Sequence, residues 1–391
     1  MARRPVEPAR PSDVLEEYDE NEPTGVELDP EDDSATVVSP YDPRLIRVDP
    51  KVYSVRQVID MIDDQELDLA PDFQRRRVWR VRQKSLLIES ILLRIPLPAF
   101  YFSADAEGRL QVVDGVQRLS TIYEFVRDRN LPLDHLEYLG DELQGKTYND
   151  IEGTIWSRRI LNTQISANVI DPQTPVAVKF DIFRRINTGG SPLNSQEIRH
   201  CMSKDRSRQF LRDLCDTAAF RETMGSSIID HVRMVDRELA LRFTAFKLIG
   251  DIANFKRYGS MDEFLTEINQ LLDNSHEVTA RQLRTLADGF VRAMENARLL
   301  FGQHAFRKWP EGYGYLYPIN RALFDVWSVA LSDISPDRLE RMKGPLVDGA
   351  RSLMTNDGDF ISAISTGTSS PQKIITRFDR VLDLVRECEN D

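Results

Sequence analysis

Strand-forming patterns are confined to the first half of this 391-residue chain, and this distribution constrains the fold more than any other feature. The apolar run at residues 99–102 indicates a buried strand, and residues 110–113 indicate a second one. β-branched strand patterns fade after residue 186, and from residue 196 apolar residues recur at helical spacing. The sequence therefore predicts an α+β domain over residues 50–195 and an all-α domain over residues 196–391.

Residues 1–45 differ from the rest of the chain in charge and composition. They hold thirteen acidic and four basic residues, so nine of the twelve net negative charges lie here, together with seven of the twenty prolines. No periodic apolar pattern runs through them, and such a composition does not offset the entropy lost on ordering. We expect a disordered acidic tail. It would act as a solvating extension or compete with DNA for a basic surface.

Composition also indicates where the chain resides. No apolar run approaches twenty residues, which excludes a membrane span, and the first ten residues lack the apolar core of a secretory signal. The three cysteines have neither disulfide-framework nor zinc-site spacing, which is typical of a reducing cytoplasm. We expect a cytoplasmic protein without membrane contact.

Helix boundaries can be placed near the start of the folded part. Ser54 is a plausible N-cap, followed by apolar residues at helical spacing. Residues 82–93 predict a second helix, and Pro96 and Pro98 end it before the first buried strand.

The most informative stretch, residues 112–121, places an Asp-Gly turn between an apolar strand and a helix. The N–H groups and dipole at a helix start favour phosphate oxygens. Gly115 permits a tight turn, Arg118 offers a planar donor fork for phosphate, and Asp114 can hold Mg²⁺ or cap the helix. A purely structural corner with a capping Asp and a surface Arg is the alternative, because Asp-Gly turns are common.

A basic patch precedes this corner. Residues 75–84 carry six positive charges. Trp79 lies among these charges, and Phe73 lies just before them. Phosphates, including those of DNA, are the natural partner, and a solvated charged face is the alternative. Residues 183–194 predict a loop between two helices. A contact between Asn187 and the pocket at the corner is the functional alternative there.

These segments together resemble the N-terminal domain family of GmrSD restriction enzymes, which carries an Asp-Gly-Gln-Gln-Arg motif. The resemblance covers about residues 50–200 and rests on four segments in the same order. They are Phe73-Gln74-Arg75 with Val78-Trp79, residues 87–92 with Ile95-Pro96-Leu97-Pro98, Asp114-Gly115-Val116-Gln117-Arg118-Leu119, and residues 186–193.

The resemblance implies a fold similar to the ParB and sulfiredoxin nucleotide-binding domains. A nucleoside triphosphate (NTP) and its Mg²⁺ would be held at the motif corner, and nucleotide hydrolysis in the family is tied to DNA restriction. Carried over by position, the motif makes Asp114, Gln117 and Arg118 the implied catalytic residues, with Asp114 as the metal ligand. The implied nucleotide contacts are Gln74, Arg75, Gly115, Thr121 and Asn187.

Two departures from the family pattern bear on activity. Val116 occupies the position of the first Gln of the motif, so one amide side chain is missing. The sequence therefore supports nucleotide binding more strongly than nucleotide hydrolysis. Family members that cut DNA usually carry an HNH nuclease domain, whose metal site needs clustered His with Asn or Asp. The five histidines are scattered, so we expect no HNH nuclease. Acidic residues also lie close to His231 in the sequence. We expect them to form salt bridges with Arg237 on a helix face and not a nuclease centre.

Three functions follow from these features. The first is an NTP-binding, Mg²⁺-dependent, hydrolysing regulator or sensor in bacterial DNA restriction or phage defence. The second is a non-enzymatic DNA-binding or adaptor module that contacts DNA through residues 75–84 and recruits a separate nuclease. The third and least supported is a nuclease without an HNH domain that uses Asp114 and other acids around a metal.

Overall fold

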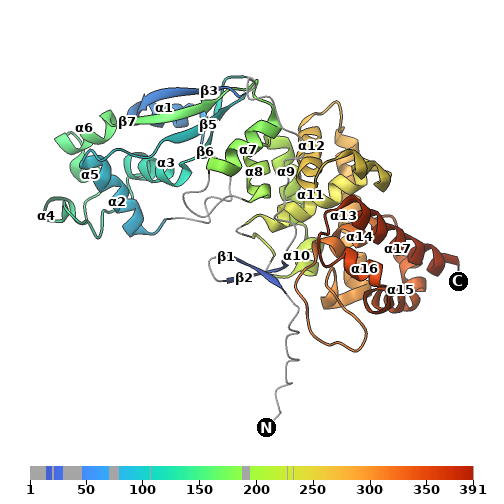
Figure 1. Cartoon of the computed structure of the whole chain (residues 1–391). Helices are drawn as coiled ribbons and strands as arrows, with labels where there is room; N and C mark the ends of the chain where they lie inside the picture. The colour runs from blue at the N-terminus through green and yellow to red at the C-terminus, as the bar shows by residue number, and fades with distance from the viewer. Residues whose placement is uncertain are drawn as a thin grey trace, which may run out of the picture. The chain divides into compact units, whose positions relative to one another are not determined.

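The computed structural model describes residues 15–19, 22–29, 46–69, 79–105, 107–186, 194–226, 228–231 and 233–390. The chain divides into two compact units. The sheet unit comprises residues 40–202, and the helical unit comprises residues 203–391 together with residues 1–39. The predicted fold class is confirmed, because a mixed sheet and its helices precede a C-terminal part that is mostly helical (Figure 1).

The sheet unit is built on five strands in the order β3-β7-β5-β6-β4. Pairing is antiparallel for β3 with β7 and for β5 with β6, and parallel for β5 with β7 and for β4 with β6. The strands are β3 (Val48–Ser54), β4 (Leu67–Asp68), β5 (Phe100–Ala104), β6 (Leu110–Asp114) and β7 (Gln164–Ile170). The two strands expected from the apolar runs are therefore neighbours, β5 and β6.

The helices of this unit begin and end where local chemistry requires. The Ser54 hydroxyl accepts from the Gln57 N–H and caps the first helix, as predicted. The second helix ends at Leu92, before Pro96. The helices are α1 (Val55–Asp63), α2 (Val81–Leu92), α3 (Val116–Tyr123) with its π-helical continuation Glu124–Asp128, α4 (Gly140–Leu143), α5 (Tyr148–Ile151), α6 (Ile155–Asn162), α7 (Val176–Ile186) and α8 (Ser195–Met202).

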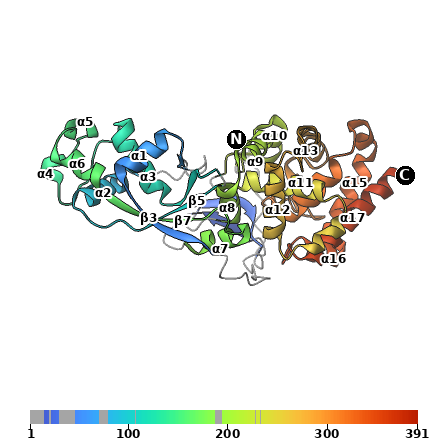
Figure 2. The ribbon, with the colours of Figure 1, turned by 90° about the horizontal axis from the view of Figure 1, so that it is seen from above.

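One face of the sheet carries the core of the unit. Phe100 and Phe102 of β5 are fully buried and alternate with less buried neighbours, as a strand with one core face requires. Figure 2 shows α1, α2, α3 and α6 gathered on one side of the strands. Buried apolar side chains of these helices and of β5, β6 and β7 form a single cluster.

The helical unit packs its helices around the buried α11 and α14. Its helices are α9 (Asp205–Asp216), α10 (Ala218–Met224), α11 (Val235–Ile249), the 3₁₀ helix Ile252–Arg257, α12 (Met261–Asp273), α13 (Ala280–Phe301), the 3₁₀ helix Gly302–His304, α14 (Arg321–Leu331), α15 (Pro336–Asn356), α16 (Gly358–Ala363) and α17 (Pro371–Asn390). Phe210, Leu239 and Phe246, which belong to the apolar residues at helical spacing after residue 196, all lie in its apolar cluster.

A buried carboxylate holds helices α11, α14 and α17 together. Asp325 is fully buried and accepts from Arg242 at 3.1 Å and from Arg377 at 2.8 Å. Burial raises the pKa of Asp325, and the two guanidinium groups oppose that rise. A carboxylate in this position needs both cations, because an unpaired buried charge is strongly destabilising.

The expected disorder of residues 1–45 is wrong for the part that the structure describes. β1 (Glu16–Asp19) and β2 (Glu22–Glu27) form an antiparallel hairpin in the helical unit. Val26 is 0% exposed within the core, and the Glu27 N–H donates to the Ile319 carbonyl at 2.8 Å. Residues 1–14, 20–21 and 30–45 lie outside the described residues.

Ion pairs explain why this acidic segment is ordered. Glu17 meets Arg321 through two contacts of 2.5 and 3.1 Å, and Glu27 meets Lys308 at 2.5 Å. Both Asp29 oxygens accept backbone N–H groups, from Gly367 and Thr368. Charges that repel one another in the isolated segment are thus paired with cations and N–H dipoles of the helical unit.

Val26→Ala tests whether the hairpin belongs to the folded unit. The loss of buried methyl groups should cost about 1–3 kcal/mol and lower the Tm of thermal unfolding. Val52→Ala, at a position 61% exposed, is the matched control and should leave the Tm within error. Equal Tm values for the two variants would contradict the docking of the hairpin.

Candidate functional site at the Asp114 corner

The candidate site is the corner at which β6 ends and α3 begins. Gly115 joins them with a φ of +97°, a region that favours glycine. A Cβ at this position would lie 2.3 Å from Phe100 Cδ1 and 3.1 Å from Arg118 Nη2. Both the backbone angle and the close approach of the Phe100 ring therefore require glycine at this corner.

Arg118 is the residue that holds the corner together. Its Nη2 donates to Asp114 Oδ2 at 2.8 Å and to the Ala99 carbonyl at 3.3 Å, and its Nη1 donates to the Pro98 carbonyl. The guanidinium carbon lies 4.3 Å from the centre of the Phe100 ring. These contacts connect the end of β6 to the chain entering β5.

The environment of Arg118 is partly desolvated. Its side chain is 13% exposed. Burial lowers the pKa of Arg118, while the Asp114 carboxylate opposes the shift without cancelling it. A cation in such a place interacts more strongly with a nearby phosphate than a fully hydrated one does.

Asp114 is the more accessible partner of this pair. Its side chain is 32% exposed, and its Oδ2 faces Arg118. Within the part of the chain that the structure describes, only Oδ2 accepts a hydrogen bond, and Oδ1 has no partner. Mg²⁺ commonly takes one or two carboxylates, with waters and substrate phosphates completing its shell. Asp114 therefore fits the single-carboxylate metal site that the motif implies.

The N-terminal turn of α3 has no side-chain cap. Its N-cap residue is Gly115. N–H groups in a first helical turn have no partner within the helix, and they point along the positive end of its dipole. The turn therefore adds phosphate-binding capacity beside Asp114.

Gln117 connects the corner to the segment that carries the basic patch. Its Oε1 accepts from the Trp79 N–H at 3.4 Å, and its backbone carbonyl accepts from the Thr121 hydroxyl at 2.7 Å. Thr121 is 1% exposed, so its hydroxyl fixes the helix turn from the buried side. Two of the four resembling segments thus meet at Gln117.

The other expected nucleotide contacts are not described at the corner. Gln74, Arg75 and Asn187 lie outside the described residues. Val116, at the position of the first motif Gln, is buried in the core of the sheet unit. A valine there fills core volume, while Gln117 supplies the motif amide at the corner.

The described half of the basic patch is only partly available to a ligand. Arg80 and Arg82 are exposed at the start of α2. Lys84 pairs with Glu124 of the π-helical turn at 2.5 Å, which neutralises one of the six charges. Residues 75–78 lie outside the described residues.

Sequence patterns missed one buried acid that supports the unit. The Glu89 carboxylate accepts the backbone N–H groups of Glu137, Tyr138 and Leu139 at 2.8–3.0 Å. Burial would raise the pKa of Glu89, but the three N–H donors together outweigh it, and the net shift is downward. The only signal in the sequence is a charged residue inside the apolar face of α2.

Residues 55–203 match the family described as GmrSD restriction endonuclease, N-terminal domain. The resemblance inferred from the four segments is therefore confirmed for this part of the chain. A search of curated proteins found no match. Among the described residues, every helix is too short or too polar to span a membrane.

Gly115→Ala and Gly108→Ala form a matched pair for the corner. Both glycines have positive φ, but a Cβ at Gly108 meets nothing within 4 Å. The Gly108 change should cost about 1 kcal/mol for the backbone alone. Gly115→Ala should cost roughly 2 kcal/mol more, because the Phe100 ring must move. Urea unfolding curves give the difference, and equal costs would contradict the packing role.

Glu89→Gln tests the buried acceptor. At neutral pH the variant should be less stable by about 1–3 kcal/mol, since an amide NH₂ replaces an acceptor oxygen. The pKa of Glu89 is lower in the folded state, so its contribution is present above the unfolded pKa and is lost as pH falls through the folded pKa.

The stability difference from wild type should therefore shrink on acidification, as urea unfolding at several pH values would show. The matched control, Glu137→Gln, changes an exposed side chain and should have little effect at any pH. A difference that is independent of pH would contradict the role of the carboxylate.

Proposed function

We propose that this chain, whose residues 55–203 form a GmrSD-type N-terminal domain, is an NTP-binding and hydrolysing regulator or sensor in bacterial DNA restriction or phage defence. The observation that carries the proposal is the corner itself. An uncapped helix start lies beside a partly desolvated arginine and beside a carboxylate whose Oδ1 has no hydrogen-bond partner among the described residues. Such a combination suits a phosphate chain accompanied by Mg²⁺.

Each corner residue has a distinct role in the proposed site. The first-turn N–H groups of α3 bind phosphate oxygens, and Asp114 holds Mg²⁺, which would neutralise phosphate charge when bound. Arg118 supplies positive charge and fixes the orientation of Asp114. Gln117 orients the attacked phosphate or the attacking water. Thr121 holds the Gln117 carbonyl in place.

The remaining contacts belong to segments on either side of the corner. We propose that Gln74, Arg75 and Asn187 approach the nucleotide from the segments that flank Trp79 and α7. The Trp79 contact with Gln117 supports the first of these, because it brings the end of that segment to the corner.

Arg118→Ala is a poor test of this site, since it would release the corner as well as remove a charge. Asp114→Asn is sharper because the amide oxygen can still accept from Arg118 while the metal ligand is weakened. We expect affinity for Mg²⁺-NTP to fall at least about tenfold with little change in Tm, since metal-bridged binding depends on the carboxylate. Calorimetric titration of all four NTPs, followed by a phosphate-release assay, measures this.

The matched control is Asp141→Asn, an exposed aspartate of α4 in the same unit. It should bind nucleotide like wild type. Binding without phosphate release would assign a sensor rather than a hydrolase. The absence of NTP binding by the wild-type protein, or equal binding by Asp114→Asn, would contradict the proposal.

A DNA-binding or adaptor module that recruits a separate nuclease is the second candidate. It is favoured by the exposure of Arg80 and Arg82 at the start of α2. In this case the motif corner has only a structural role. The packing of Gly115 and the hydrogen bonds of Arg118 agree with that role as well. DNA affinity that falls steeply with salt, in a protein that binds no NTP, would favour this candidate.

A further inference from the structure

A basic cleft lies in the sheet unit among residues that the corner does not use. Its volume is about 570 Å³. It lies between the connection from α2 to β5 and one face of α6. The lining residues are Arg94, Ile95, Pro96, Leu97, Ile155, Arg158, Arg159, Asn162, Thr163 and Gln164. Three of them are arginines and none is acidic.

Helix α6 presents one face to this cleft. Ile155, Arg158, Arg159 and Asn162 follow the three- and four-residue spacing of a single helix face. The opposite face of α6 carries Ile160, which is fully buried in the core. The cleft is therefore part of the outer surface, and two of its three arginines, Arg158 and Arg159, belong to α6, while Arg94 lies just after the end of α2.

The three arginines are held in different ways. Arg159 forms the inner wall, with Nη1 donating to the Leu92 carbonyl at 3.4 Å and its guanidinium 4.9 Å from the Trp156 ring centre. Its Nε is buried and has no hydrogen-bond partner among the described residues. Arg94 and Arg158 are exposed, and neither side chain contacts an acceptor in the described part of the chain.

The backbone at Arg94 adds an independent observation. Arg94 has a φ of +63° at the end of α2, and the Ile95 N–H donates back to the Ser90 carbonyl at 2.9 Å. Helix ends of this type normally have glycine at the left-handed position. Here an arginine occupies it and lines the cleft. A strained position with an unpaired charged side chain suggests a functional reason for that side chain.

The apolar part of the lining narrows the ligand class. Ile95 and Ile155 are 50% and 54% exposed, and Pro96 and Leu97 continue the same surface. A chain of phosphates separated by apolar sugar faces matches a lining in which arginines and apolar side chains occur together. In protein–DNA complexes, at least about half of the hydrogen bonds from the protein go to phosphates and sugars.

We propose that this cleft binds the phosphodiester backbone of DNA through Arg94, Arg158 and Arg159. The site is separate from the motif corner and does not depend on nucleotide binding there. It also differs from the basic patch, because Arg82 lies in the first turn of α2 and Arg94 follows the last. The twelve residues of α2 span about 18 Å, so the two basic surfaces lie at opposite ends of one helix.

The test combines Arg94→Gly with Arg158→Gln. Glycine suits the left-handed backbone at position 94, and glutamine keeps the helix propensity at position 158, so Tm should not fall. Fluorescence anisotropy with a labelled DNA duplex, at salt concentrations from about 50 to 200 mM, gives affinity and its salt dependence. We expect affinity to fall tenfold or more near ~0.1 M salt and the logarithmic salt slope to decrease by about two.

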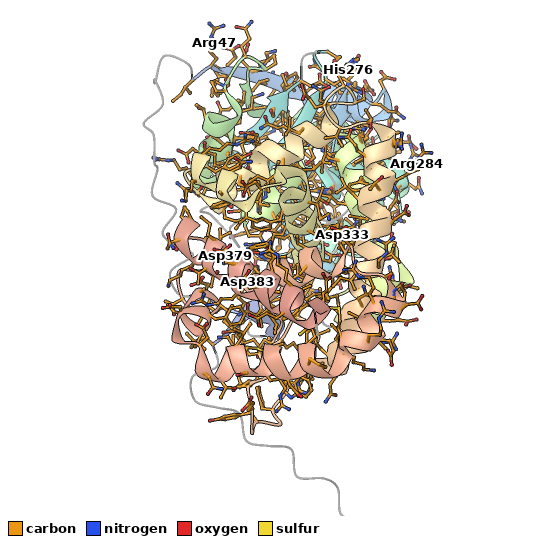
Figure 3. The ribbon with its side chains drawn as sticks, turned by 90° about the vertical axis from the view of Figure 1, so that its right-hand side faces the viewer. Arg47, His276, Arg284, Asp333, Asp379 and Asp383 are labelled. Atoms are coloured by element: carbon orange, nitrogen blue, oxygen red, sulfur yellow. The ribbon has the colours of Figure 1, made fainter. Side chains whose placement is uncertain are left out.

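The control is the double variant Arg284→Gln and Arg341→Gln, which removes two exposed charges from α13 and α15. Figure 3 shows Arg284 on the outer side of α13. This variant should bind DNA like wild type. Equal loss in both double variants would indicate a nonspecific charge effect and overturn the proposal.

The phosphate groups that the cleft binds can belong to DNA or to a free nucleotide. A second titration, with NTP, distinguishes these two ligands. NTP binding measured by calorimetry should be unchanged in the Arg94 and Arg158 variant, whereas Asp114→Asn should leave DNA binding intact. Loss of NTP binding with DNA binding retained would assign the cleft to nucleotide instead. Undetectable DNA binding by wild type at low salt would also overturn the proposal, while leaving the proposal for the corner unaffected.

Discussion

The contacts of the Arg118 guanidinium are the constraint on which the candidate site depends. One side chain joins Asp114 at the end of β6 to the carbonyls of Pro98 and Ala99 at the entry to β5, and it covers the Phe100 ring. Because β5 and β6 are paired antiparallel, the guanidinium closes this strand pair where α3 begins. The carboxylate is therefore oriented before any ligand arrives, which reduces the entropy lost on binding.

Some motif residues are therefore explained by their structural role in the fold, and others keep atoms that are available to bind a ligand. Packing against Phe100 accounts for Gly115, and the carbonyls before β5 accept two of the three hydrogen bonds of the Arg118 side chain. Asp114 Oδ1 has no hydrogen-bond partner among the described residues, and the first turn of α3 has no side-chain cap. A structural corner and a phosphate site are consequently compatible, since they use different atoms of the same short stretch.

Sequence reasoning succeeded where the determining interactions are local. The Ser54 cap, the end of α2, the strands at residues 99–102 and 110–113, and the strand-turn-helix corner each depend on neighbours within a few residues. Glu89 depends on N–H groups 48 to 50 residues away, and the Glu17 side chain depends on Arg321, 304 residues away. Such pairings leave no periodic pattern, so an acidic segment that is ordered by distant cations was expected to be disordered.

Charge illustrates why the whole-chain balance is a weak guide to partners. A net charge of -12 argues against nucleic acid only if the charge acts evenly over the surface. Within the helical unit, Glu17 forms an ion pair with Arg321, and Glu27 forms one with Lys308. In the sheet unit, a cleft with three arginines has no acidic lining residue. Screening limits interactions between exposed charges to about 10 Å at ordinary ionic strength, so the local surface, and not the total, determines which ligand approaches.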